Sequence, residues 1–256
     1  MSAVGVTPAR VLRSEWIKLN TLRSTKITFA TAVALMIGFG ILISWDTASK
    51  FGSMTAAARA DLDVEERVLA GRMFAELAIG VLGVMAITGE YATGMIRATL
   101  AAVPRRLPVL WTKLGLFAGV TFAVMTTASF VSFFAGNAIL SEHWDFSLSD
   151  PGVLRSVLGA GVVLTFVCLL GTALGFVLRN TAGAISALVG ILMVLPVVGQ
   201  FSEWVSAHLP TGAIRSLVTA RIEDGMMRPL PAFLLLCAYL AVAIAGAAWT
   251  LQRRDA

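Results

Sequence analysis

Arg72 and Glu76 are a pair of residues whose types and spacing could support chemistry. They stand four positions apart at the start of an apolar run, so on a helix their side chains would meet on one face. An acid within an apolar run is a functional candidate, because ionisable groups inside a membrane often mark ion or proton pathways. The alternative, which we favour, is a structural ion pair about one helical turn from the membrane surface.

Hydroxyl and amide side chains give a later apolar run a polar component. The candidates for a substrate pathway are Thr126, Thr127, Ser129 and Asn137. Such groups can face a cavity between helices, or they can simply form hydrogen bonds from one helix to another. Both interpretations remain open from the sequence.

Enzyme motifs are absent from the sequence. It has no HExxH zinc motif, no GxSxG nucleophile turn and no GxxxxGK[ST] phosphate loop. The two histidines, His143 and His208, have no metal-ligand neighbours, and Cys168 and Cys237 fall within apolar runs. We therefore expect no catalytic residue, no metal site and no cofactor on this chain, and we expect that it is not an enzyme by itself.

The composition identifies the environment in which these residues are positioned. Of the 256 residues, 57% are hydrophobic and only 14% are charged, against about 25% charged in a typical soluble domain. The mean hydropathy is +0.84. This composition argues against a soluble α/β enzyme and excludes a disordered chain, and the absence of strand alternation excludes a membrane β-barrel. The sequence predicts an all-α integral membrane protein.

Six apolar runs are long enough to cross a bilayer as helices, which requires about 20 residues each. They form a single transmembrane domain over residues 27–251, with expected spans at about 27–45, 73–88, 114–140, 153–178, 182–201 and 230–251. Residues 1–26 and 252–256 are then terminal segments. We expect the first span to remain as an anchor, because no signal-peptide cleavage pattern follows it.

The distribution of charge predicts the orientation. With both termini in the cytoplasm, the inner segments hold 12 basic and 3 acidic residues, a net charge of +9, and the outer segments hold 8 basic and 12 acidic residues, a net charge of −4. Basic residues gather on the cytoplasmic side of membrane proteins. The sequence thus predicts a multi-pass protein of the plasma (inner) membrane with both termini cytoplasmic. Its total of +5 reflects this orientation, so we expect no nucleic-acid partner.

Residues 8–26 form a basic stretch before the first span. Leu12, Trp16 and Leu19 recur at helical spacing, although Glu15 interrupts their face. We expect an interfacial helix on the inner membrane surface. The alternative is an ordinary basic tail held by anionic lipid.

Residues 89–113, between spans two and three, are the densest inner segment. A short cytoplasmic helix is expected through Ile96, Leu100 and Val103, ending near Pro104, and Pro108 then restarts the chain. A short helix with an apolar stripe favours a partner surface, whereas the alternative is a plain basic loop that orients the protein.

Two further patterns concern proline and glycine. Pro196 should kink the fifth span, and the apolar outer segment 202–229 should form short helices broken at Pro210. The GxxxG pairs Gly115–Gly119 and Gly171–Gly175 suggest close helix contacts.

Three of these features together resemble one family. They are SEWIKLNTLRST before the first span, EYATGMIRATLAAVPRR at Glu90–Arg106 followed by Lys113, and six spans with a proline in the fifth and an apolar outer segment before the sixth. The whole chain resembles a membrane subunit, or permease, of the ABC-2 type of ABC transporter. In that family the N-terminal segment is an interfacial "elbow", and the loop between spans two and three carries a coupling helix.

The resemblance implies a function and partners. It implies an exporter that works as a dimer of membrane subunits, here expected to be a homodimer, together with a separate ABC ATP-binding subunit. ATP and magnesium would bind to that partner, and the substrate would be an amphiphile such as a drug, antibiotic or lipid. The family's docking role falls on Glu90, Thr93, Gly94, Arg97, Leu100, Arg105 and Arg106. Alternatives are a membrane scaffold or immunity subunit without transport, and an integral-membrane enzyme.

Overall fold

The computed structural model describes residues 8–60, 62–103, 106–199 and 201–253, and within these ranges the chain forms helices and no strand. Six helical segments are long and apolar enough to cross a membrane. They are α2 (Arg23–Lys50), α5 (Arg72–Ala92), α7 (Leu107–Leu140), α8 (Val153–Leu178), α9 (Thr181–Val189) with its continuation to Gly199, and α13 (Pro229–Arg253). The predicted all-α class with six potential spans is therefore confirmed at the level of length and composition.

The ends of several helices differ from the prediction. Helix α7 begins at Leu107, before the expected start at Leu114, and Pro108 lies in its first turn. Proline suits that position because the first turn of a helix leaves its N–H groups unpaired in any case. Helix α2 likewise begins at Arg23 rather than Ile27 and extends to Lys50.

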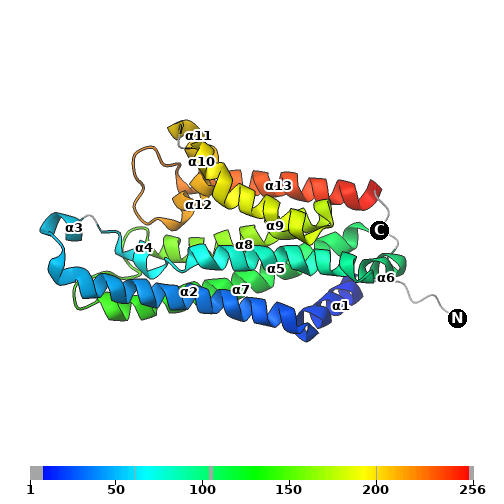
Figure 1. Ribbon diagram of the computed structural model, residues 1–256, viewed down its shortest axis with the longest axis horizontal. Helices are drawn as coiled ribbons and strands as arrows, with labels where there is room; N and C mark the ends of the chain where they lie inside the picture. The colour runs from blue at the N-terminus through cyan, green and yellow to red at the C-terminus, as the bar shows by residue number, and fades with distance from the viewer. Residues whose placement is uncertain (1–7, 61, 104–105, 200, 254–256) are drawn as a thin grey trace.

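Short helices fill the connections at the two ends of the bundle. Helices α1 (Pro8–Thr21) and α6 (Met95–Ala102) lie at the end where α13 finishes, which we call the terminal end (Figure 1). The opposite end carries η1 (Phe51–Ser53), α3 (Ala56–Ala60), α4 (Val64–Val68), α11 (Glu203–His208) and α12 (Pro210–Val218). Residues 69–71 form a turn that separates α4 from α5. Gly71 permits close packing there, since an added Cβ would lie 2.0 Å from the Met36 carbonyl oxygen.

Helix α8 is the centre of the bundle and packs against α5, α7 and α13. Of its most apolar stretch, 67% of residues are buried, against 17% for α13 and 17% for the α9 segment. The contact with α5 is close because it is made by glycines: a Cβ on Gly83 would lie 2.1 Å from the Cys168 carbonyl oxygen, and one on Gly171 would lie 2.3 Å from that of Gly80. The outer helices are thus left to face lipid or another protein.

The fifth span is irregular near Pro196. Helix α9 passes through a π-helical turn, η2 (Gly190–Val194), into α10 (Leu195–Gly199), and the Leu195 N–H donates to the Gly190 carbonyl. Proline cannot donate to the preceding turn, and π turns and prolines are common sites of bending. Regular α-helix is therefore interrupted where the sequence predicts a kink.

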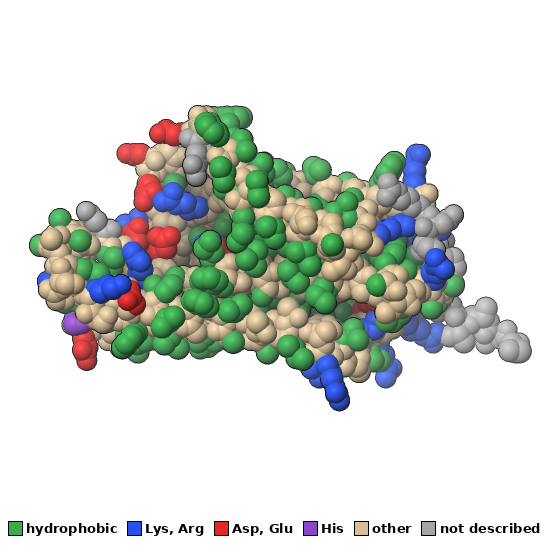
Figure 2. Space-filling view, in the orientation of Figure 1, with side chains coloured by type: hydrophobic (Ala, Val, Ile, Leu, Met, Phe, Trp, Pro, Cys, Tyr) green, Lys and Arg blue, Asp and Glu red, His purple; other side chains and the backbone are tan. Residues whose placement is uncertain are grey.

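Charge is divided unequally between the two ends of the bundle. Figure 2 shows Lys and Arg side chains gathered at the terminal end and both signs of charge at the opposite end. The described acids of the terminal end, Glu15 and Glu90, are both buried. Every exposed charged side chain in the described part of this end is therefore basic, namely Arg10, Arg13, Arg23, Lys26, Arg97 and Arg253.

Candidate functional site

Four charged side chains from three helices form a buried network at the terminal end. Lys113 Nζ of α7 lies 2.5 Å from Glu15 Oε2 of α1 and 2.7 Å from Glu90 Oε1 of α5. Lys18 Nζ of α1 lies 2.7 Å from Glu15 Oε1 and 3.0 Å from Glu90 Oε1. Each carboxylate therefore accepts from both ammonium groups, and we call these four residues the charge network.

Local helix geometry places each member of the network. Glu15 and Lys18 stand three residues apart on α1, on the side that also carries the buried Val11. Glu90 lies in the last turn of α5, and Lys113 lies in the second turn of α7. Because α5 ends and α7 begins at the same end of the bundle, one position on each helix meets the charged side of α1.

Burial makes the pairing of these charges energetically important. Glu15, Glu90 and Lys113 are exposed by only 3%, 6% and 2%. An isolated charge in such surroundings costs several kcal/mol, so a buried network persists only when its charges balance. Two lysines and two glutamates give a net charge of zero.

The pKa values of the two α1 residues are shifted from their ordinary values. Burial alone would raise the pKa of Glu15, but its charge and hydrogen-bond interactions with Lys113, followed by those with Lys18, lower it below its ordinary value. Burial alone would lower the pKa of Lys18, but Glu15 and Glu90 raise it above its ordinary value. Both groups are thus held in their charged forms at neutral pH.

The network is continuous with the short helix α6. Lys18 Nζ also donates to Thr99 Oγ1 at 3.4 Å. A small apolar cluster of Val11, Val103 and Val109, with Leu100 packed against it, joins α1, the end of α6 and the start of α7. Helix α6 begins after Gly94, whose φ of +70° favours glycine, so the chain turns sharply out of α5 and back onto α1.

The predicted docking residues separate into exposed and inward-facing groups. Thr93, Gly94 and Arg97 are exposed. Glu90 is buried in the charge network, and Leu100 packs against the apolar cluster. The partly buried Arg106 donates from Nη1 to the Leu251 carbonyl of α13 at 2.9 Å. Arg105 and Pro104 lie outside the described residues.

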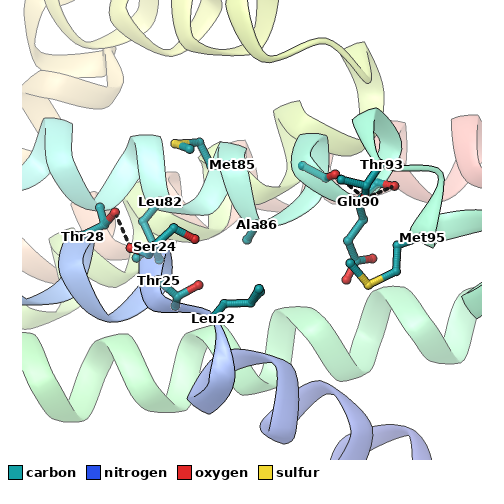
Figure 3. A pocket seen from close by; sticks show the side chains of 11 residues that line it. Leu22, Ser24, Thr25, Thr28, Leu82, Met85, Ala86, Glu90, Thr93 and Met95 are labelled. Atoms are coloured by element: carbon teal, nitrogen blue, oxygen red, sulfur yellow. Dashed lines mark hydrogen bonds between the residues drawn. The ribbon is translucent and has the colours of Figure 1, made fainter.

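A cavity of about 210 Å³ adjoins the charge network. It lies between the start of α2, the end of α5 and Met95 of α6 (Figure 3). Its polar lining consists of Ser24, Thr25, Thr28, Glu90 and Thr93. Glu90 Oε2 is buried and has no hydrogen-bond partner among the described residues, so this carboxylate retains acceptor capacity beside the cavity.

The four candidate pathway residues do not meet in one cavity. Ser129 donates to the Val157 carbonyl of α8 at 2.7 Å, which is the interhelical bonding that the sequence left as an alternative. Thr127 is exposed and donates to Ala123 of its own helix, and Thr126 Oγ1 is buried without a partner among the described residues. Asn137 is partly buried. None of the four lines the cavity of Figure 3.

Arg72 and Glu76 form an ion pair in the first two turns of α5, with Arg72 Nη1 donating to Glu76 Oε1. The pair lies at the opposite end of α5 from Glu90. Within the described ranges, no group of three or more His, Cys, Asp or Glu side chains could hold a metal ion.

Glu90 is the one network member among the predicted site residues, and the sequence does not predict a site role for Glu15, Lys18 or Lys113. The sequence suggests a membrane-facing side of α1 that Glu15 interrupts, whereas in the structure Leu12, Trp16 and Ile17 are exposed and Glu15 faces the protein. The available signal was the opposite charge at spacing three on an otherwise amphipathic segment. The two sides of α1 are thus an exposed apolar side and a buried charged side.

In comparisons with known proteins, no family model and no curated protein matches this chain.

Proposed function

We propose that this chain is the membrane-spanning permease subunit of an ABC-2 type ABC exporter, moving an amphiphilic substrate out of the cytoplasm. The observation that carries the proposal is the position of α6. This short helix exposes Arg97 at the terminal end, and on its other side it contacts α1, whose network holds α5 and α7. A force on α6 therefore has a connected path to spans two and three.

In the proposed mechanism, a separate ABC ATP-binding subunit docks on the exposed side of α6. ATP and magnesium bind to that partner, which closes and displaces α6. Transport requires two arrangements of the spans that the partner favours differently. The charge network makes α1, α5 and α7 respond together, because separating any member would leave a buried charge unpaired.

The proposed setting is the plasma (inner) membrane, with the terminal end in the cytoplasm. The exclusively basic exposed charges of the described terminal end support this orientation. The exposed apolar side of α1 supports an interfacial elbow helix lying on the inner leaflet. A second membrane subunit, a copy of this chain, would complete the pathway, and the weakly buried α2, α9 segment and α13 leave surface for it.

The test is to co-express the full chain with an ABC ATP-binding subunit encoded beside it, and to reconstitute the purified complex in vesicles. ATP-dependent movement of a fluorescent amphiphile supports the proposal. Failure of the two subunits to co-purify would overturn it. Stable co-purification and ATP hydrolysis without movement of any amphiphile would instead indicate a scaffold or immunity subunit.

A further inference from the structure

A second hollow lies at the opposite end of the bundle from the charge network. It is a groove of about 510 Å³ between α8, α12 and α13. Its apolar wall consists of Leu154, Leu158 and Val162 of α8, Leu217 of α12 and Phe233 of α13, and Arg155 lies at its outer end. We call it the Arg155 groove.

The groove runs along enough of α8 to hold much of one lipid acyl chain. The three α8 residues recur every four positions and therefore line one face of the helix. From Arg155 to Val162 the helix rises by about 10 Å, which is about two-thirds of the depth of one leaflet's hydrocarbon layer. Leu154, Leu158 and Phe233 are each exposed, so the groove is open to the surroundings of the bundle.

The walls of the groove are held in place by contacts of α8 with α12. Ser156 Oγ donates to the Val218 carbonyl, and Arg155 donates to the carbonyls of Ser216, Thr219 and Ala220 at 2.9–3.0 Å. Gly159 permits the close approach, since an added Cβ would lie 2.3 Å from the Leu217 carbonyl oxygen. The groove is thus preformed and does not depend on a ligand to bring its walls together.

The charge of Arg155 is only partly compensated. Its three acceptors are neutral carbonyls at the C-terminal end of α12, and within the described ranges no carboxylate forms an ion pair with it. A helix C-terminus supplies about half a negative charge. A guanidinium has five N–H donors, so some of them remain available for an anionic group that also fits the apolar groove.

We propose that the Arg155 groove binds an anionic phospholipid of the leaflet at this end, with the phosphate beside Arg155 and one acyl chain along Leu154, Leu158 and Val162. A net-negative lipid is favoured over a zwitterionic one because Arg155 contributes the only charge of the groove lining. The site is independent of the proposed transport function, since it rests on α8, α12 and α13 alone.

The test is photocrosslinking in nanodiscs containing the full chain and traces of phosphatidylglycerol or phosphatidylcholine with a diazirine on the acyl chain. Labelled peptides are mapped by mass spectrometry. The exposed Val242 of α13, which lies outside the groove, reports contact with bulk lipid. For each probe, the labelling of residues 154–162 is divided by the labelling of Val242. We expect this ratio to be about fivefold higher for phosphatidylglycerol than for phosphatidylcholine.

Three variants separate the site from general lipid contact. Arg155→Gln keeps amide donors near the α12 carbonyls but removes the charge. It should bring the ratio of phosphatidylglycerol to phosphatidylcholine labelling close to one. Leu158→Trp fills the groove while keeping Arg155, and it should reduce labelling at Val162. Arg215→Ala removes an exposed basic residue of α12 and should change nothing.

Equal labelling ratios at residues 154–162 and at Val242 in the wild type would overturn the proposal. A preference that survives both Arg155→Gln and Leu158→Trp would also overturn it. Crosslinks between two copies of the chain at residues 154–162, without lipid labelling there, would show that a second protomer covers the groove instead.

Discussion

Lys113 of α7 and Glu15 of α1 form a buried ion pair although 98 residues separate them in the sequence. The pair holds a terminal helix, which the sequence suggests is simply membrane-associated, onto the start of a span. Together with Lys18 and Glu90, it turns the terminal end of the bundle into one connected unit.

Replacing Lys113 should strongly destabilise the protein. Lys113→Met would leave two buried glutamates with Lys18 as their only cation among the described residues, at an expected loss of about 3–5 kcal/mol. Thermal unfolding of the purified protein measures the loss. The matched control is Lys50→Met, which removes an exposed pair with Asp46 and should cost at most about 1 kcal/mol. Similar decreases in unfolding temperature in the two variants would show that the buried network contributes no more stability than an exposed ion pair.

Acid should release the same contacts. The folded protein lowers the pKa of Glu15 below its ordinary value of 4.5, so the Glu15 contribution is present above that value and is lost as the pH falls through the folded-state pKa. Lys18, whose pKa is raised above 10.5, contributes below that value and loses its contribution as the pH rises through its folded-state pKa. We expect the unfolding temperature to decrease when the pH is lowered below about 4.

Glu15→Gln tests the assignment of this acid transition. The variant should be less stable at pH 7, and it should lose less stability between pH 6 and pH 3 than the wild type does. An acid transition of the same size in both proteins would assign it to other carboxylates.

Arg97 and Leu100, three residues apart on α6, should behave differently. Arg97→Ala removes an exposed side chain, so it should leave the unfolding temperature unchanged and weaken co-purification with the ATP-binding subunit. Leu100→Ala removes packing against Val11, Val103 and Val109, at a cost of about 2 kcal/mol. Arg13→Ala, at an exposed position of α1, is the control for general loss of positive charge. If Arg97→Ala binds the partner as well as the wild type does, the docking role of α6 is wrong.

Two glycine substitutions should have opposite consequences. Gly83→Ala would place a Cβ 2.1 Å from the Cys168 carbonyl oxygen and push α5 away from α8, at a cost of about 1–3 kcal/mol. Gly115→Ala meets open space, so the better helix propensity of alanine should make it neutral or slightly stabilising. Unfolding temperatures in one detergent compare them directly. A tolerated Gly83→Ala would mean that the contact between α5 and α8 is easily adjusted.

The same glycine residues show how far the sequence predicts the fold. Hydropathy locates six spans, because the length of an apolar run is a local property. The GxxxG pairs of α7 and α8 have the same spacing, but Gly171 and Gly175 pack against α5 while Gly115 and Gly119 have nothing near them. Which face of a helix meets a neighbour depends on the whole bundle, and residue spacing alone does not contain that information.

The candidate site was predictable in the same partial way. Glu90, Arg97 and Leu100 could be located on one inner segment from the resemblance, but not divided into buried and exposed residues. From the sequence, Glu15 is a break in an apolar face, because Lys113 and Glu90, which complete its network, lie far along the chain. A charge that reduces amphipathicity on one segment becomes favourable once another segment supplies its counter-charge.

The separation of Glu15 from Lys113 in the sequence also means that the two residues are synthesised at different times. When the ribosome has made α1 and the first two spans, three members of the charge network are present, namely Glu15, Lys18 and Glu90. The second cation arrives with the start of α7. A nascent or truncated chain that stops before α7 therefore holds one more carboxylate than ammonium group among the members of the charge network. Such a chain differs in charge balance from the finished protein, and α1 can take its final position only after insertion of the third span has begun.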